Sequence, residues 1–232
     1  MVSAADLNVL PGESSIKSYR LVNSKFPPIA LFDDVANVDE FDILYQVQAL
    51  TNPRLQNEVG VITLIALSEI PFGITGCSYA TAPFTHVNPD GSRFSDGSFG
   101  MLYLADTMDT AIAEVRHHQE AYWSKVQELN YERFVFRGLT CQFDEVGVLD
   151  ATVLPMTDPI YAPDDYSASR ALGRDVKRAK ASGLRYRSVR SPGNICWALT
   201  TPRHVASITQ SSHYEMIWNK KITSVNKLVS ST

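Results

Sequence analysis

The sequence predicts an α+β fold, because stretches with the two-residue alternation of β-strands are interleaved with stretches of helical periodicity. Residues 133–143 (RFVFRGLTCQF) show the strand alternation, and apolar residues between 35 and 50 recur at near-helical spacing. The chain of 232 residues is 44% hydrophobic and 20% charged, and no shift in composition marks a linker. We therefore expect residues 1–232 to form a single domain with several short strands, four helices and a helical insertion at about residues 30–75.

The N-terminal part of the chain is predicted to contain one strand and two helices. Residues 18–23 form the strand, and the apolar periodicity predicts the first helix over 35–50. Asn52 and Pro53, a cap residue followed by proline, predict the start of a second helix that runs to about Glu69. Residues 71–100 are rich in glycine and proline, so we expect a loop there, with one short strand near 77–81.

The middle of the chain reads as strand, helix and strand. Apolar residues predict a strand over 101–105, and cap residues between 106 and 109 begin a helix that reaches Leu129. The alternating stretch 133–143 is the next strand, and residues 146–152 extend it.

The C-terminal part is predicted to contain a helix over 166–182, closed by Gly183 in the C′ position. Two strands follow at 184–191 and 195–201, around a turn that contains proline and glycine. Residues 204–218 are predicted to form a final pair of strands.

The charge and the apolar stretches exclude some classes of protein. The net charge of -4 and the pI of about 5.7 do not favour nucleic-acid binding, which usually shows a basic balance. The longest apolar stretch, residues 59–67, is far shorter than the roughly 20 residues of a membrane helix. Residues 1–11 lack the basic start and apolar run of a secretory signal. We therefore expect a cytoplasmic protein that binds neither membrane nor nucleic acid.

The cysteines and histidines do not predict a metal site. Cys77, Cys141 and Cys196 are far apart, and none of the five histidines stands at a ligand spacing from them. We expect free thiols in a reducing cytosol and no metal. His117 and His118 allow a metal ligand or a general base as alternatives, but we favour a solvated pair.

Three polar residues stand at regular intervals around the predicted strand 101–105. Arg93, Tyr103 and Glu114 are separated by ten and eleven residues. An arginine fork binds phosphate oxygens, a tyrosine offers a flat face to an aromatic ligand, and a carboxylate stabilises positive charge that develops on a sugar. Together these residues suit a dinucleotide whose glycosidic bond is broken.

The order of these residues in the chain resembles that of the RES domain family, which is named for an arginine, a glutamate and a serine and includes toxins of toxin–antitoxin pairs. Tyr19-Arg20 resembles the first family motif, Arg93 to Glu114 the second, and Gly183 to Arg190 the third. The resemblance spans residue 18 to about residue 200. Phe94 stands where a tryptophan is usual.

The resemblance implies a fold related to the ADP-ribosyltransferase toxins, with a split sheet core, flanking helices and a helical insertion. It also implies that NAD+ is consumed as a substrate by cleavage of the nicotinamide–ribose bond, with no further cofactor and no metal. An antitoxin or immunity protein that blocks the active site is implied as a partner.

Roles for individual residues follow from the same resemblance. Arg20 and Arg93 would bind the pyrophosphate or the nicotinamide-side ribose, and Tyr103, together with Tyr19, would line the nicotinamide pocket. Glu114 would stabilise the ribosyl cation or orient the nucleophile. Ser188 would hold the nicotinamide ribose or the backbone around it.

Plainer interpretations stay open at several of these positions. Arg20 also fits a surface arginine beside a strand, and Tyr103 a packing residue in a strand. Glu114 also fits a surface acid that pairs with His117 or His118. At the level of function, the alternatives are ADP-ribosyl transfer to a protein target, for which the insertion would supply a recognition surface, and an inactive binding module.

Overall fold

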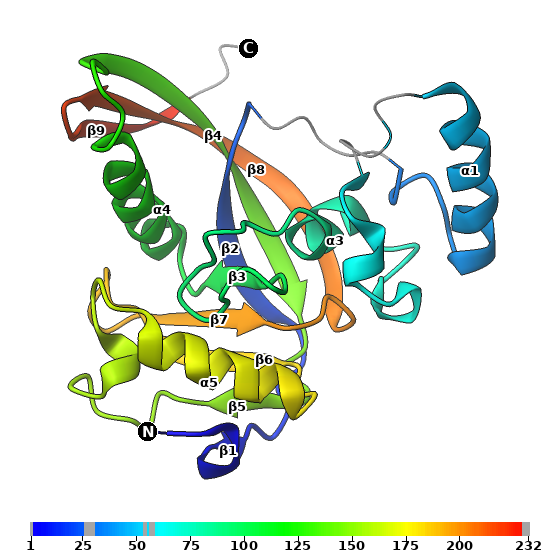
Figure 1. Ribbon diagram of the computed structural model, residues 1–232, viewed down its shortest axis with the longest axis horizontal. Helices are drawn as coiled ribbons and strands as arrows, with labels where there is room; N and C mark the ends of the chain where they lie inside the picture. Colours follow the sequence, from blue (N-terminus) through cyan, green and yellow to red (C-terminus); the bar gives the residue numbers. More distant parts are fainter. Residues whose placement is uncertain (1, 26–30, 53–54, 56–58, 229–232) are drawn as a thin grey trace.

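A computed structural model describes residues 2–25, 31–52, 55 and 59–228 (Figure 1). Among these residues, nine strands form one mixed sheet in the order β1-β5-β6-β7-β3-β2-β4-β8-β9. β5 and β6 are parallel, and the other neighbouring strands in the sheet are antiparallel. The strands are β1 (Asn8–Val9), β2 (Ile16–Asn23), β3 (Leu102–Ala105), β4 (Tyr131–Phe143), β5 (Val148–Asp150), β6 (Gly183–Arg187), β7 (Ile195–Leu199), β8 (Val205–Asn219) and β9 (Ile222–Leu228).

The described helices flank this sheet. The α-helices are α1 (Val38–Thr51), α3 (Cys77–Thr85), α4 (Met108–Trp123) and α5 (Ser167–Arg178). Short 3-10 turns occur at η1 (Ala4–Asp6), η2 (Ile62–Leu64), η3 (Leu67–Glu69) and η4 (Pro159–Tyr161). The α+β class and the interleaving of strands with helices are thereby confirmed, whereas the single domain with an insertion at 30–75 stays a prediction.

The sheet changes direction at β3. β5, β6 and β7 run across the lower part of the molecule, while β4 and β8 run steeply past them (Figure 1). β3 pairs with β7 along its whole length, but its ladder to β2 consists of Tyr19 and Ala105 alone. The two halves of the sheet are therefore joined at one narrow point.

Three apolar clusters hold the helices against the sheet. Leu21, Phe134 and Phe136 pack beneath α4 on one face of β2 and β4. Leu139 and Cys141 belong to the cluster that packs α3 on the other face. Successive side chains of a strand point to opposite sides, so apolar residues of the same strand pack in both clusters. α5 packs with β5, β6 and β7 in a separate cluster.

One predicted strand is a helix in the structure. Residues 77–81 belong to α3, whose buried residues Cys77, Ala80, Thr81 and Phe84 follow helical spacing. Gly76 precedes the helix in a left-handed conformation, with φ of 78°. The prediction of a strand was wrong because the surrounding glycines and prolines concealed this helical period.

Several predicted boundaries also differ. The helix predicted to reach Leu129 ends at Trp123, and residues 146–152 contain the separate strand β5. Residues 205–218 belong to the single strand β8, which pairs with β9 instead of folding back on itself. Of the helix predicted over 53–69, residues 53–54 and 56–58 lie outside the described residues, and residues 62–69 contain η2 and η3.

The predicted helix cap at Gly183 is wrong. α5 ends at Arg178, and Lys180 takes the left-handed conformation beyond its end, with φ of 55°. Gly183 instead begins β6, where a Cβ atom would lie 2.8 Å from the carbonyl oxygen of Ala198. Close packing of β6 on β7, and not helix termination, therefore requires this glycine.

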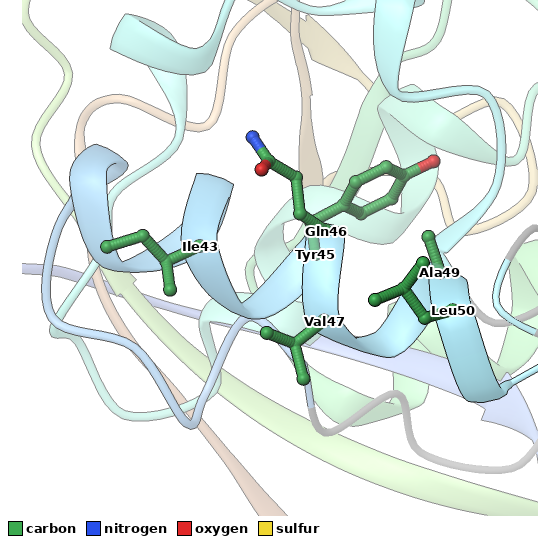
Figure 2. A pocket seen from close by; sticks show the side chains of 6 residues that line it. All are labelled: Ile43, Tyr45, Gln46, Val47, Ala49 and Leu50. Atoms are coloured by element: carbon green, nitrogen blue, oxygen red, sulfur yellow. The ribbon is translucent and has the colours of Figure 1, made fainter.

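α1 carries a second apolar face that the described residues do not cover. Ile43, Val47 and Leu50 are 66%, 56% and 85% exposed, while Phe41 is buried. Figure 2 shows Ile43 and Val47 on one side of the helix and Tyr45 on the other. α1 lies at the edge of the molecule, away from α4 (Figure 1). Within the described part of the chain, none of the helices has the length and apolar character needed to cross a membrane.

Candidate active site

A cleft of about 460 Å³ lies where the two halves of the sheet meet, between β2, β3 and α4. Five of the six residues that the sequence singled out line it. The sixth, Ser188, is fully buried behind the cleft wall. Asn88, Gly91, Ser92 and Tyr166 also line the cleft. The five lining residues are Tyr19, Arg20, Arg93, Tyr103 and Glu114.

α4 forms one wall of the cleft. Thr107 caps its first turn by accepting a hydrogen bond from the amide of Thr110. Residues spaced three and four apart lie on one face of a helix, and one such face points into the cleft. The residues of α4 on this face are Ala111, Glu114, Val115, His118, Gln119 and Tyr122.

Glu114 is held by a buried hydroxyl from a distant segment. Ser188 Oγ donates to Glu114 Oε1 at 2.7 Å, and it accepts from the amides of Ser191 at 2.9 Å and Arg190 at 3.2 Å. Since both lone pairs of the hydroxyl are occupied, its proton is directed to the carboxylate. Ser188 therefore holds the Glu114 carboxyl group in place from behind the cleft wall.

Arg93 is a buried cation with an unsatisfied donor. Its side chain is 5% exposed, and Nη1 donates to the carbonyl oxygens of Ile160 at 3.2 Å and Ala162 at 2.9 Å. The guanidinium lies over the Tyr166 ring, 4.6 Å from its centroid. Nη2 is buried and has no hydrogen-bond partner among the described residues. A buried, unneutralised guanidinium of this kind favours an anionic ligand.

Arg20 places a second cation in the cleft. Its Nη1 donates to the carbonyl oxygen of Tyr103 at 3.2 Å, and no ion pair to it occurs among the described residues. Burial lowers the pKa of Arg20 to about 10, so the guanidinium is still charged at neutral pH. The structure thus brings Arg20 and Arg93 into one cleft, although they come from distant parts of the chain.

The hydroxyl of Tyr103 is already bound within the protein. It lies 2.7 Å from Ser92 Oγ and accepts from the amide of Phe94 at 3.0 Å. Burial raises its pKa, so it stays protonated. Tyr103 therefore holds the segment that carries Arg93, and it offers its ring rather than its hydroxyl to a ligand.

α5 presses the same segment against the sheet. Arg170 donates to the carbonyl oxygens of Ser92 at 3.0 Å and Asp90 at 2.8 Å. Gly173 approaches Phe94 so closely that a Cβ atom would lie 1.8 Å from the Phe94 carbonyl oxygen. The position of Arg93 thus depends on a glycine in α5.

The two adjacent histidines lie differently from one another. His118 lines the cleft, whereas His117 Nε2 lies 4.0 Å from Asp164 Oδ1. Burial lowers the pKa of both rings. Among the described residues, no group of three or more histidine, cysteine, aspartate or glutamate side chains is placed to hold a metal ion.

Sequence reasoning missed three aromatic residues of the cleft. Tyr166 stacks on Arg93, Tyr122 stands at the far end of the α4 wall, and Tyr186 packs edge-on against Phe94 at 4.8 Å. Tyr186 lies within the third motif, so that motif could have identified it. Nothing in the sequence distinguishes Tyr122 or Tyr166 from other tyrosines.

The mixed sheet has a cleft at its junction, and that cleft contains two arginines and a carboxylate held by a serine hydroxyl. These features define a protein with a site for an anionic ligand. The sequence matches the RES domain family over residues 70–219. It is 30% identical over 203 residues to the uncharacterized protein y4oC of Sinorhizobium fredii, a match that covers 87% of this chain and 82% of that one. The chain belongs to the RES domain family.

The family match contains Arg93, Tyr103, Glu114 and Ser188, while Arg20 precedes it. A chain in the crystal structure of the M. tuberculosis MbcT–MbcA toxin–antitoxin complex is 16% identical and aligns with a TM-score of 0.39. That alignment covers 53% of this chain and 73% of the other. A TM-score of this size does not establish a shared fold.

Proposed function

We propose that this protein is a toxin that degrades NAD+ by cleaving the nicotinamide–ribose bond, with water or phosphate as the acceptor. The observation that carries the proposal is the cleft itself, in which Glu114, oriented by Ser188, faces the same space as Arg20 and Arg93. Membership of the RES domain family supports the proposal.

In the proposed reaction, the bond between the ribose C1′ and the nicotinamide nitrogen breaks. Nicotinamide leaves with the electron pair and becomes neutral, while positive charge develops on the ribose. The Glu114 carboxylate stabilises this charge, as carboxylates do in glycosidic chemistry. Water then adds to this ribose carbon and loses a proton to give ADP-ribose. Alternatively, phosphate adds to the same carbon to give the phosphate ester of ADP-ribose at that position. The enzyme is thus an NAD+ glycohydrolase or an NAD+ phosphorylase.

The two arginines supply the affinity for the dinucleotide. The pyrophosphate of NAD+ carries two negative charges, and Arg93 Nη2 is a buried donor without a partner among the described residues. Pairing a pyrophosphate oxygen with this donor satisfies it. Tyr19 and Tyr103 supply ring surface around the nicotinamide.

The proposal extends to the fold and to the partner. The narrow join between β2 and β3 agrees with the split sheet expected of an ADP-ribosyltransferase-like core. Arg20 and Arg93 form no ion pair with any other described residue and so attract acidic groups. A neutralising antitoxin or immunity protein would therefore present a carboxylate or a chain terminus to them. The substrate pool would be cytosolic NAD+.

The test is the turnover of NAD+ by purified protein, with and without phosphate, followed as released nicotinamide. Glu114→Gln keeps the size of the side chain but removes its charge, so we expect a loss of about 100-fold or more. Ser188→Ala keeps the carboxylate but removes its donor, so we expect a smaller loss. Glu13→Gln, an exposed glutamate outside the cleft, serves as the matched control.

Wild-type turnover by a folded Glu114→Gln variant would contradict the proposed role. Labelled protein in place of free product would instead identify a transferase that modifies proteins. A folded wild-type protein that consumes no NAD+ would identify an inactive binding module.

A further inference from the structure

α4 carries a row of side chains along the whole length of the cleft. Glu114, His118 and Tyr122 follow one another at intervals of four residues, and all three line the cleft. At the rise of an α-helix, Tyr122 lies about 12 Å further along the helix axis than Glu114. The cleft therefore has a carboxylate at one end of this wall and an aromatic ring at the other.

Tyr122 differs from the other tyrosines of the cleft in its exposure. It is 62% exposed, whereas Tyr19, Tyr103, Tyr166 and Tyr186 are buried or half-buried. Two of those rings already have fixed partners, since Tyr103 holds the segment of Arg93 and Tyr166 stacks on its guanidinium. The Tyr122 ring is accessible to a ligand from the cleft.

The ring of Tyr122 has a rigid support. It meets Trp123 edge-on, with the centroids 4.8 Å apart and the planes at 90°. Trp123 is itself fixed, because Nε1 donates to Gln119 Oε1 at 2.8 Å and its ring stacks on Phe134 at 4.7 Å. A supported and exposed aromatic ring at the mouth of a cleft is a suitable surface for a flat ligand.

We propose that Tyr122 is the stacking platform for the purine base of the dinucleotide. This inference rests on the proposed function, since it needs the scissile bond at Glu114. In a dinucleotide, two riboses and a pyrophosphate separate the two bases. With the nicotinamide end at Glu114 and the pyrophosphate at Arg20 and Arg93, the second base extends along α4 towards Tyr122. Stacking requires only the face of the ring, so the phenolic hydroxyl is dispensable.

The test compares two substrates that share the scissile bond. NAD+ contains the adenosine half, and nicotinamide mononucleotide lacks it. For Tyr122→Ala we expect KM for NAD+ to rise about 5- to 150-fold, the equivalent of the ~1–3 kcal/mol of a base–aromatic stack, with kcat nearly unchanged. For nicotinamide mononucleotide we expect kcat/KM to stay as in the wild type. Tyr122→Phe should behave as the wild type with both substrates.

Tyr131→Ala is the matched control, because Tyr131 is 64% exposed and lies outside the cleft. An unchanged KM for NAD+ in Tyr122→Ala would overturn the inference. So would an equal loss with both substrates, which would place Tyr122 at the scissile bond, or a loss in Tyr122→Phe, which would assign the effect to the hydroxyl.

A calorimetric titration with ADP-ribose separates this inference from the proposed function. If the wild type cleaves neither substrate, the proposed function fails, and the titration alone decides the role of Tyr122. Weaker binding by Tyr122→Ala, with binding retained in Tyr122→Phe and Tyr131→Ala, would support the purine platform. Equal affinities, or no binding by the wild type, would reject it.

Discussion

Arg20 is a residue whose burial costs stability. It lines the cleft, and its side chain donates to the neutral carbonyl of Tyr103. Burial is the main reason that its pKa falls to about 10. A lowered pKa of a cation means that the fold disfavours the charged form. At neutral pH Arg20 is charged in both the folded and the unfolded chain, so the folded state bears this unfavourable free energy.

We therefore predict that Arg20→Met keeps or raises the free energy of unfolding at pH 7 while NAD+ turnover at low substrate concentration falls. The lost hydrogen bond to Tyr103 is worth only about 1 kcal/mol and is offset by the removal of a desolvated charge. Urea unfolding followed by circular dichroism, beside the turnover assay, measures both effects. A drop in unfolding free energy of more than about 2 kcal/mol would mean that Arg20 is structural.

At the scale of elements, α5 and the segment before β3 form one unit. The helix touches that segment at Gly173, and Arg170 bonds the carbonyls of Ser92 and Asp90. Arg93 stands next to Phe94, whose carbonyl is the atom that a Cβ at position 173 would strike. The placement of the buried guanidinium is therefore coupled to the packing of a helix about 80 residues further along the chain.

This coupling predicts the effect of Gly173→Ala. In an ordinary helix interior, replacing glycine with alanine stabilises by about 0.5–1 kcal/mol. Here we expect the opposite sign, a destabilisation of about 1–3 kcal/mol, because backbone has to move to relieve a 1.8 Å approach. NAD+ turnover should fall as well, because Arg93 moves with Phe94. Thermal unfolding and the turnover assay check the prediction, and a stabilised, fully active variant would show that the approach is not restrictive.

At the scale of the whole molecule, histidine burial links stability to pH. His117 and His118 are neighbours on α4 and His204 lies just before β8, and desolvation is the main cause that lowers the pKa of each ring. For His204 the nearby Arg203 acts in the same direction and Asp144 opposes it. The unfolded chain therefore takes up protons on these rings at a higher pH than the folded protein does.

We predict that the free energy of unfolding is constant above about pH 7 and falls as the pH drops through the unfolded histidine value of about 6.5. A second fall is expected below about pH 4, because Asp96, Asp150 and Glu215 have lowered pKa values in the fold. Urea unfolding at pH 7.5 and pH 5.5 tests the first step. His204→Asn should make that step smaller, and equal stability of the wild type at both pH values would contradict the prediction.

Local patterns in the sequence predicted much of the fold. The alternation of residues 133–143 and the caps near 106–109 predicted β4 and α4, because side-chain periodicity and capping act within a few residues. Prediction failed where distant packing decides. Gly183 allows β6 to pack closely on β7. α3 forms despite the neighbouring glycines and prolines, because its apolar face packs against β8.

The candidate site shows the same division. The sequence by itself determined the family and which residues carry charge, aromatic rings and hydroxyls, because motif spacing and residue chemistry are local properties. Only the tertiary structure decided that Ser188 donates to Glu114 across 74 residues, that Arg20 bonds the carbonyl of Tyr103 across 83, and that Arg93 keeps a buried donor without a partner among the described residues. Hydrogen-bond partners and burial depend on atoms that arrive from distant parts of the chain, and these are set by the way the sheet halves meet and the helices pack on them.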